Sequence, residues 1–313
     1  MMEPLFLHPV MQEKIWGGTR LREEFDYVIP SEMTGECWAI SAHPNGVSTV
    51  VNGAFAGWGL DQLYAQHREL FGNSESPVFP LLTKILDAND WLSVQVHPDD
   101  TYGLAHEGEL GKTECWYVIA AAEGAEIIYG HQAQSKEDLA AQIQAGNWED
   151  LLTRVPVKAG DFFFVPSGTM HAIGKGILIL ETQQSSDTTY RVYDFDRRDD
   201  QGNLRELHIQ QSIDVTTIGQ PANSHPDKQI IGNLGTTTFV SNPFFTVYQW
   251  EVTGPVEMKK VADYYLVSVL DGQGQVTVGE QTYPLQKGQH FILPSTVASW
   301  KFDGQLHLIA SHP

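Results

Sequence analysis

Short runs of apolar and β-branched residues, separated by Gly, Pro and Asn, dominate the chain from end to end. The clearest of these runs cover residues 36–41, 46–51, 91–96, 115–120, 161–165 and 177–182. Many short strands with turn residues between them are typical of antiparallel barrels and sandwiches. The pattern therefore predicts a mainly β fold.

Helical spacing is rarer, and it occurs in two places. Apolar positions from Leu60 to Phe71 repeat every three to four residues and stop before Gly72. A second pattern begins at Ser135, where Ser and an Asp three residues later resemble a capping box, and it ends near Gly146. We expect both helices to decorate the outside of a β-barrel.

The chain also contains an internal repeat. Residues 158–167 match residues 286–295 at an offset of 128, with Gly, Pro and Ser in the same places. The stretch 221–227 between the two copies is rich in Pro, Asn and Ser and is typical of a linker. The repeat predicts two related β-domains, residues 1–220 and residues 221–313.

Composition and charge exclude several classes of partner. The 313 residues carry 39 acidic and 19 basic side chains, a formal net charge of -20 that disfavours binding to nucleic acid or anionic membranes. No stretch approaches the roughly 20 apolar residues that span a bilayer. Only two cysteines are present and the first residues do not resemble a signal peptide, so we expect a cytoplasmic protein. The oligomeric state stays open.

Two of the predicted strands bring histidines to a common place. His97 ends one run, and His171 follows a turn at Pro166 that ends another. Glu114 opens the run between them, and Gln95 lies two residues before His97, on the same face of a strand. Two imidazoles and one carboxylate suit zinc or a related divalent ion, with the Gln95 amide as a weaker fourth ligand.

The same residues carry a resemblance to a known superfamily and to one family within it. Gly160, Pro166, Gly168 and His171 fit the second cupin motif, G-x5-P-x-G-x2-H, although Lys175 stands where that motif usually has Asn. The first cupin motif would have His-x-His, whereas this chain has Gln at position 95. In having Gln at this position the chain resembles the short type I mannose-6-phosphate isomerases. The same resemblance extends to the segments 16–18, 36–41, 79–88, 112–114 and 189–195.

The resemblance covers about residues 5–215 and implies both fold and function. It implies two cupin-type (jelly-roll) β-barrel domains with a few decorating helices, the second of which has Ser299 in place of His171 and lacks metal ligands. It also implies one Zn2+ per chain, held by the equivalents of Gln95, His97, Glu114 and His171. Arg191 matches the arginine that acts on or binds the substrate in that family.

The implied reaction interconverts mannose 6-phosphate and fructose 6-phosphate through an enediol, which requires a proton-transfer group and stabilisation of charge on oxygen. Glu181, at the end of an apolar run, and Lys112 are the candidates for proton transfer, and the residues do not decide between them. The guanidinium of Arg191 suits a phosphate or an oxyanion, and Lys84 and Lys112 could complete a cationic pocket.

Two other functions remain open at this point. One is a metal-dependent cupin oxygenase that acts on a neutral small molecule, and the other is a non-catalytic two-barrel protein that binds sugars. An oxygenase requires redox-active iron and usually more histidine ligands than this motif provides. A binding protein would tolerate loss of the metal.

Overall fold

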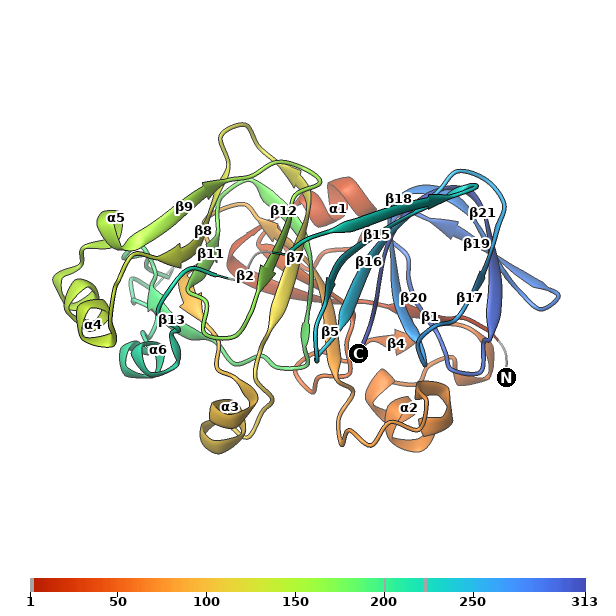
Figure 1. Cartoon of the computed structure of the whole chain (residues 1–313), viewed down its shortest axis with the longest axis horizontal. Helices are drawn as coiled ribbons and strands as arrows, with labels where there is room; N and C mark the ends of the chain where they lie inside the picture. Colours follow the sequence, from red (N-terminus) through yellow and green to blue (C-terminus); the bar gives the residue numbers. More distant parts are fainter. Residues whose placement is uncertain (1–2, 200, 222–223) are drawn as a thin grey trace.

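Three antiparallel sheets of six, five and ten strands form most of the computed structural model, which describes residues 3–199, 201–221 and 224–313. In Figure 1 the six- and five-stranded sheets lie toward one end of the long axis, and the ten-stranded sheet, whose later strands are teal to blue, lies toward the other. Helices are few and short. The predicted mainly β fold with decorating helices is confirmed.

The first two sheets pack face to face around a shared apolar core that includes Trp116, Ile127, Ile173 and Ile179. The six-stranded sheet contains β2 (Val10–Gly18), β3 (Thr34–Ile40), β5 (Leu81–Ala88), β7 (Glu114–Ala121), β10 (Phe162–Val165) and β12 (Ile177–Gln184). The five-stranded sheet contains β6 (Val94–Val96), β8 (Glu126–His131), β9 (Leu152–Pro156), β11 (His171–Ile173) and β13 (Tyr190–Tyr193).

The third sheet is built mostly from the end of the chain. It contains β1 (Leu5–His8), β4 (Thr49–Val50), β14 (Asp227–Ile231), β15 (Leu234–Ser241), β16 (Thr246–Val252), β17 (Val256–Lys259), β18 (Tyr265–Val278), β19 (Gln281–Gln286), β20 (His290–Leu293) and β21 (Ser299–His312). Strand β1 pairs with β20, so the beginning of the chain extends this sheet. We keep the division into domains at residue 220 as a proposal. The predicted linker includes residues 222 and 223, which lie outside the described residues, and its last residue begins β14.

The internal repeat is visible in the strands. Strand β20 begins 128 residues after β10, and β21 occupies the interval that corresponds to β11, the following turn and β12. Strand β18 pairs with both β20 and β21, just as β7 pairs with both β10 and β12. Where α4 and α5 connect β8 to β9, a two-residue turn connects β18 to β19. The sequence offset therefore reflects a repeated strand order.

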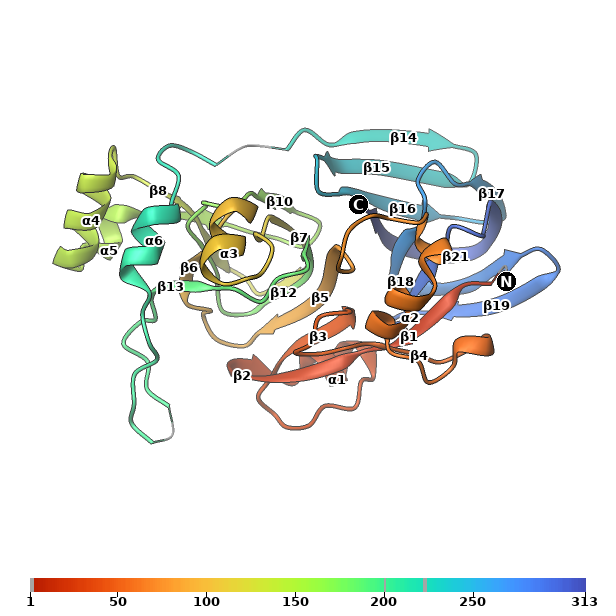
Figure 2. The same cartoon turned by 90° about the horizontal axis from the view of Figure 1, so that it is seen from below.

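The helices lie outside the sheets (Figures 1 and 2). They are α1 (Arg20–Phe25), α2 (Leu60–Gln66), α3 (Asp100–His106), α4 (Lys136–Ala145), α5 (Trp148–Leu151) and α6 (Ile209–Val215), with short 3-10 turns η1 (Gly53–Phe55) and η2 (Arg68–Phe71). The predicted helix start at Ser135 is confirmed, since the Ser135 hydroxyl accepts from the Asp138 N–H, but the Asp138 carboxylate accepts from the Gln134 N–H and so does not complete the capping box. Gly146 ends α4 with φ +67°. The helix expected from Leu60 to Phe71 is interrupted at His67, which separates α2 from η2.

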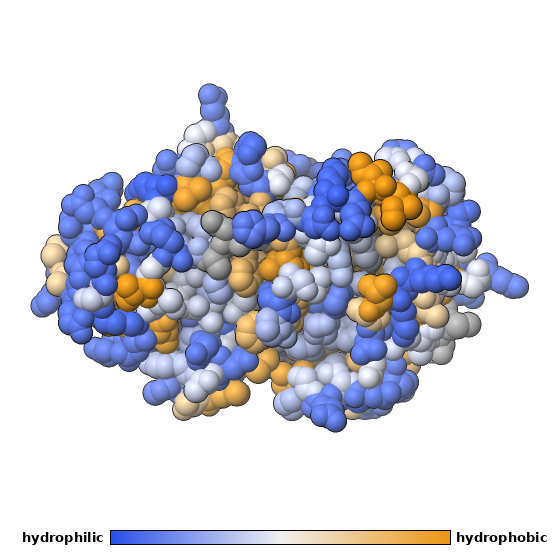
Figure 3. Space-filling view, in the orientation of Figure 1, coloured by the Kyte–Doolittle hydropathy of each residue, from blue (hydrophilic) through white to orange (hydrophobic). Residues whose placement is uncertain are grey.

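A second large apolar core joins the third sheet to the outer face of the six-stranded sheet. Phe162 stacks on Phe239 with ring centroids 4.5 Å apart, and Phe245 and Ile309 contribute to the same cluster. The face shown in Figure 3 is mostly hydrophilic, with separate hydrophobic spots, in keeping with the large net charge. In the part of the chain that the structure describes, no helix is long and apolar enough to cross a membrane.

Candidate metal centre and active site

Three predicted metal ligands meet between the six-stranded and five-stranded sheets. His97 follows β6, Glu114 begins β7 and His171 begins β11. One ligand atom from each side chain lies within 4.8 Å of the others, and all three side chains are buried. Nε2 of His97 lies 3.4 Å from Glu114 Oε2, and Nε2 of His171 lies 3.3 Å from Glu114 Oε1. Side chains far apart in the sequence therefore converge on one point.

Backbone carbonyls fix the tautomer of both imidazoles. His97 Nδ1 donates to the Thr188 carbonyl at 2.9 Å, and His171 Nδ1 donates to the Thr169 carbonyl at 2.8 Å. A neutral imidazole that carries its proton on Nδ1 has a free lone pair on Nε2, the arrangement usual in metal-binding histidines. Both lone pairs are directed toward Glu114.

Burial keeps both imidazoles neutral and leaves two atoms of the cluster without a hydrogen-bond partner. It lowers the pKa of His171 to about 4 and the pKa of His97 well below its ordinary value, so both rings are neutral near pH 7. Among the described residues, His97 Nε2 and Glu114 Oε2 are buried and have no hydrogen-bond partner. Buried polar atoms are rarely left in this state. Two imidazole nitrogens and a carboxylate oxygen without a donor fit a divalent cation, while the other oxygen of Glu114 accepts the Trp116 Nε1–H at 3.1 Å.

Gln95 is placed as the fourth member of the group. It faces His171 in the pairing of β6 with β11, and its side-chain amide lies 3.3 Å from His171 Nε2. An amide can turn its oxygen or its nitrogen toward a neighbour, so the same position can present an oxygen to a cation. Strand β6 ends at Val96, so His97 reaches the centre from just beyond the strand.

Buried charges surround the cluster. Glu181 on β12 faces Lys84 on β5, with Lys84 Nζ 3.8 Å from both Glu181 Oε1 and Glu36 Oε2. Lys112 is buried with its Nζ 3.7 Å from Glu114 Oε2, so it is not a solvated loop residue. These five side chains are 1–7% exposed, a degree of burial that charged groups reach only in paired arrangements.

Their pKa values move in different directions. Burial, assisted by the charge of Glu114, raises the pKa of Glu181 to about 7. Burial alone would raise the pKa of Glu36 as well, but Lys84, Lys14 and the Trp38 N–H lower it to about 2. Burial would lower the pKa of Lys84, yet Glu36 and Glu181 raise it. Glu181 is therefore poised to gain or lose a proton near neutral pH, while Glu36 and Lys84 keep their charge.

A cavity of about 220 Å3 lies beside the cluster, with Gln95, Lys112, Glu181 and Arg191 among its lining residues. Arg191 sits on β13, and its Nη1 donates to the Glu206 carbonyl at 2.8 Å. Its Nε is buried without a partner among the described residues. Asp194, three residues further along the chain, forms ion pairs with Arg197 and Arg205.

Sequence reasoning missed several residues that line this cavity: Lys14, Trp16, Glu36, Ser93, Asp187, Thr189 and Arg205. Glu36 had a usable signal, because it is a charged residue within an apolar run, like Glu181. Trp16 lay within a segment that resembled the family, but its place could not be deduced. Lys14 lies on β2, and the others reach the cavity from loops, which carry no periodic pattern.

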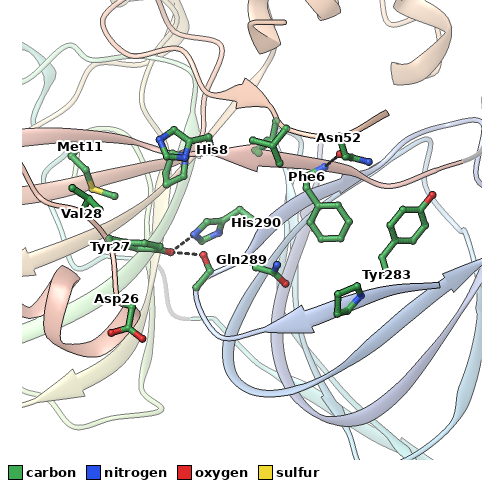
Figure 4. A pocket seen from close by; sticks show the side chains of 15 residues that line it. Phe6, His8, Met11, Asp26, Tyr27, Val28, Asn52, Tyr283, Gln289 and His290 are labelled. Atoms are coloured by element: carbon green, nitrogen blue, oxygen red, sulfur yellow. Dashed lines mark hydrogen bonds between the residues drawn. The ribbon is translucent and has the colours of Figure 1, made fainter. Parts of the chain in front are cut away.

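A larger cavity of about 640 Å3 lies elsewhere, where β1 meets β20 (Figure 4). Its walls are mainly apolar, and Tyr27 on one side donates to the Gly288 carbonyl and receives the Nε2–H of His290, both at 2.7 Å. His290 Nδ1 in turn accepts from Ser268. Tyr27 and His290 therefore have partners, unlike the buried ligand atoms at Glu114 and His97.

Two family models match the chain. The model described as phosphomannose isomerase type I, catalytic domain, matches residues 5–119, and the model described as mannose-6-phosphate isomerase, cupin domain, matches residues 235–313. The first match includes β6, β7 and three of the clustered side chains. The second match covers most of the third sheet.

Known proteins are similar over the whole length. Mannose-6-phosphate isomerase of Streptococcus mutans is 71% identical over 312 residues, which is 100% of this chain and 99% of that protein. Mannose-6-phosphate isomerase ManA of Bacillus subtilis is 53% identical over 99% of both chains. The crystal structure of mannose 6-phosphate isomerase from Bacillus subtilis superposes with a TM-score of 0.96 at 50% identity and covers 99% of each chain.

Proposed function

The chain belongs to the type I mannose-6-phosphate isomerase family, and from that membership we propose that it interconverts mannose 6-phosphate and fructose 6-phosphate with one zinc ion. Its relatives bear the name of this isomerase and match it from end to end. This favours an isomerase over the metal-dependent oxygenase and the non-catalytic sugar-binding protein.

The observation that carries the proposal is the cluster of His97, Glu114 and His171, whose ligand atoms lie within 4.8 Å of one another. These three side chains would hold the ion, and Gln95 would supply a fourth, weaker ligand. Nitrogen and oxygen donors in this number suit zinc, with room for a further ligand. When bound, the ion supplies Lewis acidity that polarises the carbonyl and hydroxyl oxygens at C1 and C2 of the sugar.

Glu181 is the proton-transfer group that we favour. Isomerisation removes a proton from C2, passes through an enediol and returns a proton to C1, or the reverse. A carboxyl with a pKa of about 7 can accept and return that proton near neutral pH. Lys84, 3.8 Å from Glu181, supports the ionised form. Lys112 faces the same cavity, where its amine can interact with the sugar oxygens as charge develops on them.

Arg191 is proposed to bind the anionic end of the substrate. The protein as a whole is strongly acidic, so an anionic sugar phosphate requires a local cationic site. Arg191 and Arg205 both line the cavity, and the unpartnered Nε of Arg191 leaves part of its fork of donors available. The two cysteines, Cys37 and Cys115, are buried free thiols, which fits our proposal that the protein resides in a reducing cytoplasm.

A coupled assay for fructose 6-phosphate tests the proposal directly. We expect activity to disappear after chelation and to return when zinc is added in equal amount to the protein. Reaction in deuterated water should place deuterium on C1 of the product to the extent that the proton exchanges with solvent. Full activity in a sample shown to be metal-free would contradict the proposal.

A further inference from the structure

The loop Ser185–Thr189, between β12 and β13, carries the carbonyl that orients the metal ligand His97. His97 Nδ1 donates to the Thr188 carbonyl at 2.9 Å, and Asp187 and Thr189 line the cavity on either side. The position of this loop therefore determines both the direction of one ligand and part of the cavity wall. What holds the loop in place decides how well the centre is formed.

One carboxylate outside the metal-ligand cluster, that of Glu109, holds the loop Ser185–Thr189 in place. Oε2 of Glu109, from the segment between α3 and β7, accepts three hydrogen bonds from the loop. These come from the Ser186 hydroxyl at 3.1 Å, the Asp187 N–H at 3.0 Å and the Thr188 hydroxyl at 3.0 Å. Three donors on one charged oxygen fix three consecutive residues, and hydrogen bonds to a carboxylate are stronger than those between neutral groups.

The other oxygen of Glu109 is tied to a third segment. His43 Nε2 lies 3.3 Å from Glu109 Oε1, and His43 Nδ1 accepts the N–H of Asn45 at 3.2 Å. Because Nδ1 accepts, Nε2 carries the proton and donates to the carboxylate. The Asn45 side chain also donates to the Asp187 carboxylate at 2.9 Å, so the segment after β3 reaches the loop by two routes.

From these contacts we infer that Glu109 is a positioning residue for the metal centre: it fixes the Thr188 carbonyl, which holds the His97 ring with Nε2 toward Glu114. The inference rests on the proposed function, because it presumes that the centre binds a metal. Residues that orient a metal-binding histidine through its second nitrogen typically change metal affinity or activity by about 10- to 100-fold when they are replaced. Glu109 acts one step further away, through the loop.

The charge state of Glu109 is consistent with this role. Partial burial would raise its pKa, but the donors from Asp187, Thr188 and Ser186, together with His43, lower it below its ordinary value. The carboxylate is thus ionised at neutral pH and accepts every one of these hydrogen bonds. Glu109 does not line the cavity and does not touch the ligand atoms, so its effect must pass through the loop.

Metal affinity of purified variants tests the inference. We expect Glu109→Ala to raise the zinc dissociation constant about 10-fold in competition with a chelator of known affinity. It should also alter the visible spectrum of the cobalt-substituted protein and speed amide hydrogen exchange at residues 185–189. Glu109→Gln keeps a carbonyl oxygen for the three loop donors but turns its NH2 group toward the His43 Nε2–H, so it should restore part of the affinity. Glu123→Ala removes the same charge from the exposed turn between β7 and β8 and should change nothing.

Thr188→Val covers the case in which Glu109→Ala does not fold. It removes a single hydrogen bond to Glu109 and leaves the carbonyl in the chain, so we expect a smaller change in the same direction. Wild-type zinc affinity and an unchanged cobalt spectrum in Glu109→Ala, or in Thr188→Val if that is the variant that folds, would overturn the inference. Failure of the wild-type protein to bind zinc would instead contradict the proposed function, so the two outcomes are distinct.

Discussion

The two copies of the repeat place corresponding strands in the same order, but they carry different side chains at corresponding positions. In the first copy, His171 begins β11 and faces Gln95 on β6. In the second copy, Ser299 begins β21 and faces Lys259 on β17. The backbone framework is shared, and the ligands are not.

The difference extends to Glu114 and to the pair of Glu181 and Lys84. Glu114 faces the end of β10, and the residue that faces the end of β20 is Tyr265. Glu181 faces Lys84 across β12 and β5, whereas the corresponding pair across β21 and β16 is Ile309 and Gln249. At these positions the second copy has neither a carboxylate nor a lysine.

Aromatic rings occupy the interior of the second copy instead. The rings of Trp250, Tyr265 and Trp300 lie with centroids 5.5–6.2 Å apart, and Phe302 packs against the same group. Buried aromatic side chains stabilise a core through apolar area and ring contacts, while buried charges require partners to offset lost hydration. The interior of the first copy therefore holds charged side chains that depend on one another as partners, and the interior of the second copy is apolar and aromatic.

The largest expected effect comes from making the first copy like the second at one position. His171→Ser should remove the metal and reduce turnover by at least about 1,000-fold, because Lewis-acid stabilisation contributes several kcal/mol and each 1.36 kcal/mol is about tenfold in rate. Metal analysis and the fructose 6-phosphate assay would be run on the same sample. Ser299→Ala, at the corresponding position of the second copy, should leave both values unchanged. A His171→Ser protein with full metal content would contradict the assigned ligand set.

The pairing of Glu36 with Lys84 and Lys14 in the first copy should make the free energy of unfolding depend on pH. Glu36, with a pKa of about 2 against an ordinary 4.5, contributes stability that is present above pH 4.5 and lost as the pH falls toward 2. The shift corresponds to about 3 kcal/mol. Glu36→Gln should therefore be less stable than the wild type at pH 6 in urea unfolding, with the gap closing as the pH falls.

A matched control for Glu36 exists in the second copy. Glu251 forms an exposed ion pair with Lys228 at 3.1 Å, and such pairs contribute less than about 1 kcal/mol. Glu251→Gln should change the unfolding free energy little at any pH. If the difference in unfolding free energy between wild type and Glu36→Gln stayed constant from pH 6 to pH 3, the charge of Glu36 would not stabilise the fold through Lys84 and Lys14.

Elements fixed by local sequence were predicted well, and those fixed by distant contacts were not. Helix α4 was predictable at both ends because Ser135 and Gly146 act within a few residues of each helix end. The run predicted over residues 46–51 shortens to Thr49–Val50, since Gly46 closes a turn onto His43. The metal ligands were found through motifs and a resemblance. Glu109 carries no motif, and its partners lie 66 and 77–79 residues away, so no sequence pattern could have identified it.

Arg191 separates substrate binding from metal binding. Its guanidinium lies on β13 and lines the cavity, and no described ligand atom of the centre depends on it. Arg191→Ala should keep the zinc and lower kcat/KM by about 100-fold, since a lost hydrogen bond to a charged group costs about 1.5–3 kcal/mol. Normal kinetics in this variant would show that the arginine has a structural role. Arg197→Ala is not a suitable control, because Arg197 pairs with Asp194.

The smallest expected effect tests whether one histidine is enough to give the second copy a metal centre. Ser299 is exposed at the start of β21, so Ser299→His should fold normally and accept the larger side chain. The introduced imidazole would face Lys259, and Tyr265 and Val261 stand where the first copy has Glu114 and His97. A single neutral imidazole beside a cation offers one donor where zinc requires three or four protein ligands. Metal analysis should therefore still find one zinc per chain, and a second tightly bound equivalent would show that the framework of the repeat, more than its side chains, creates the site.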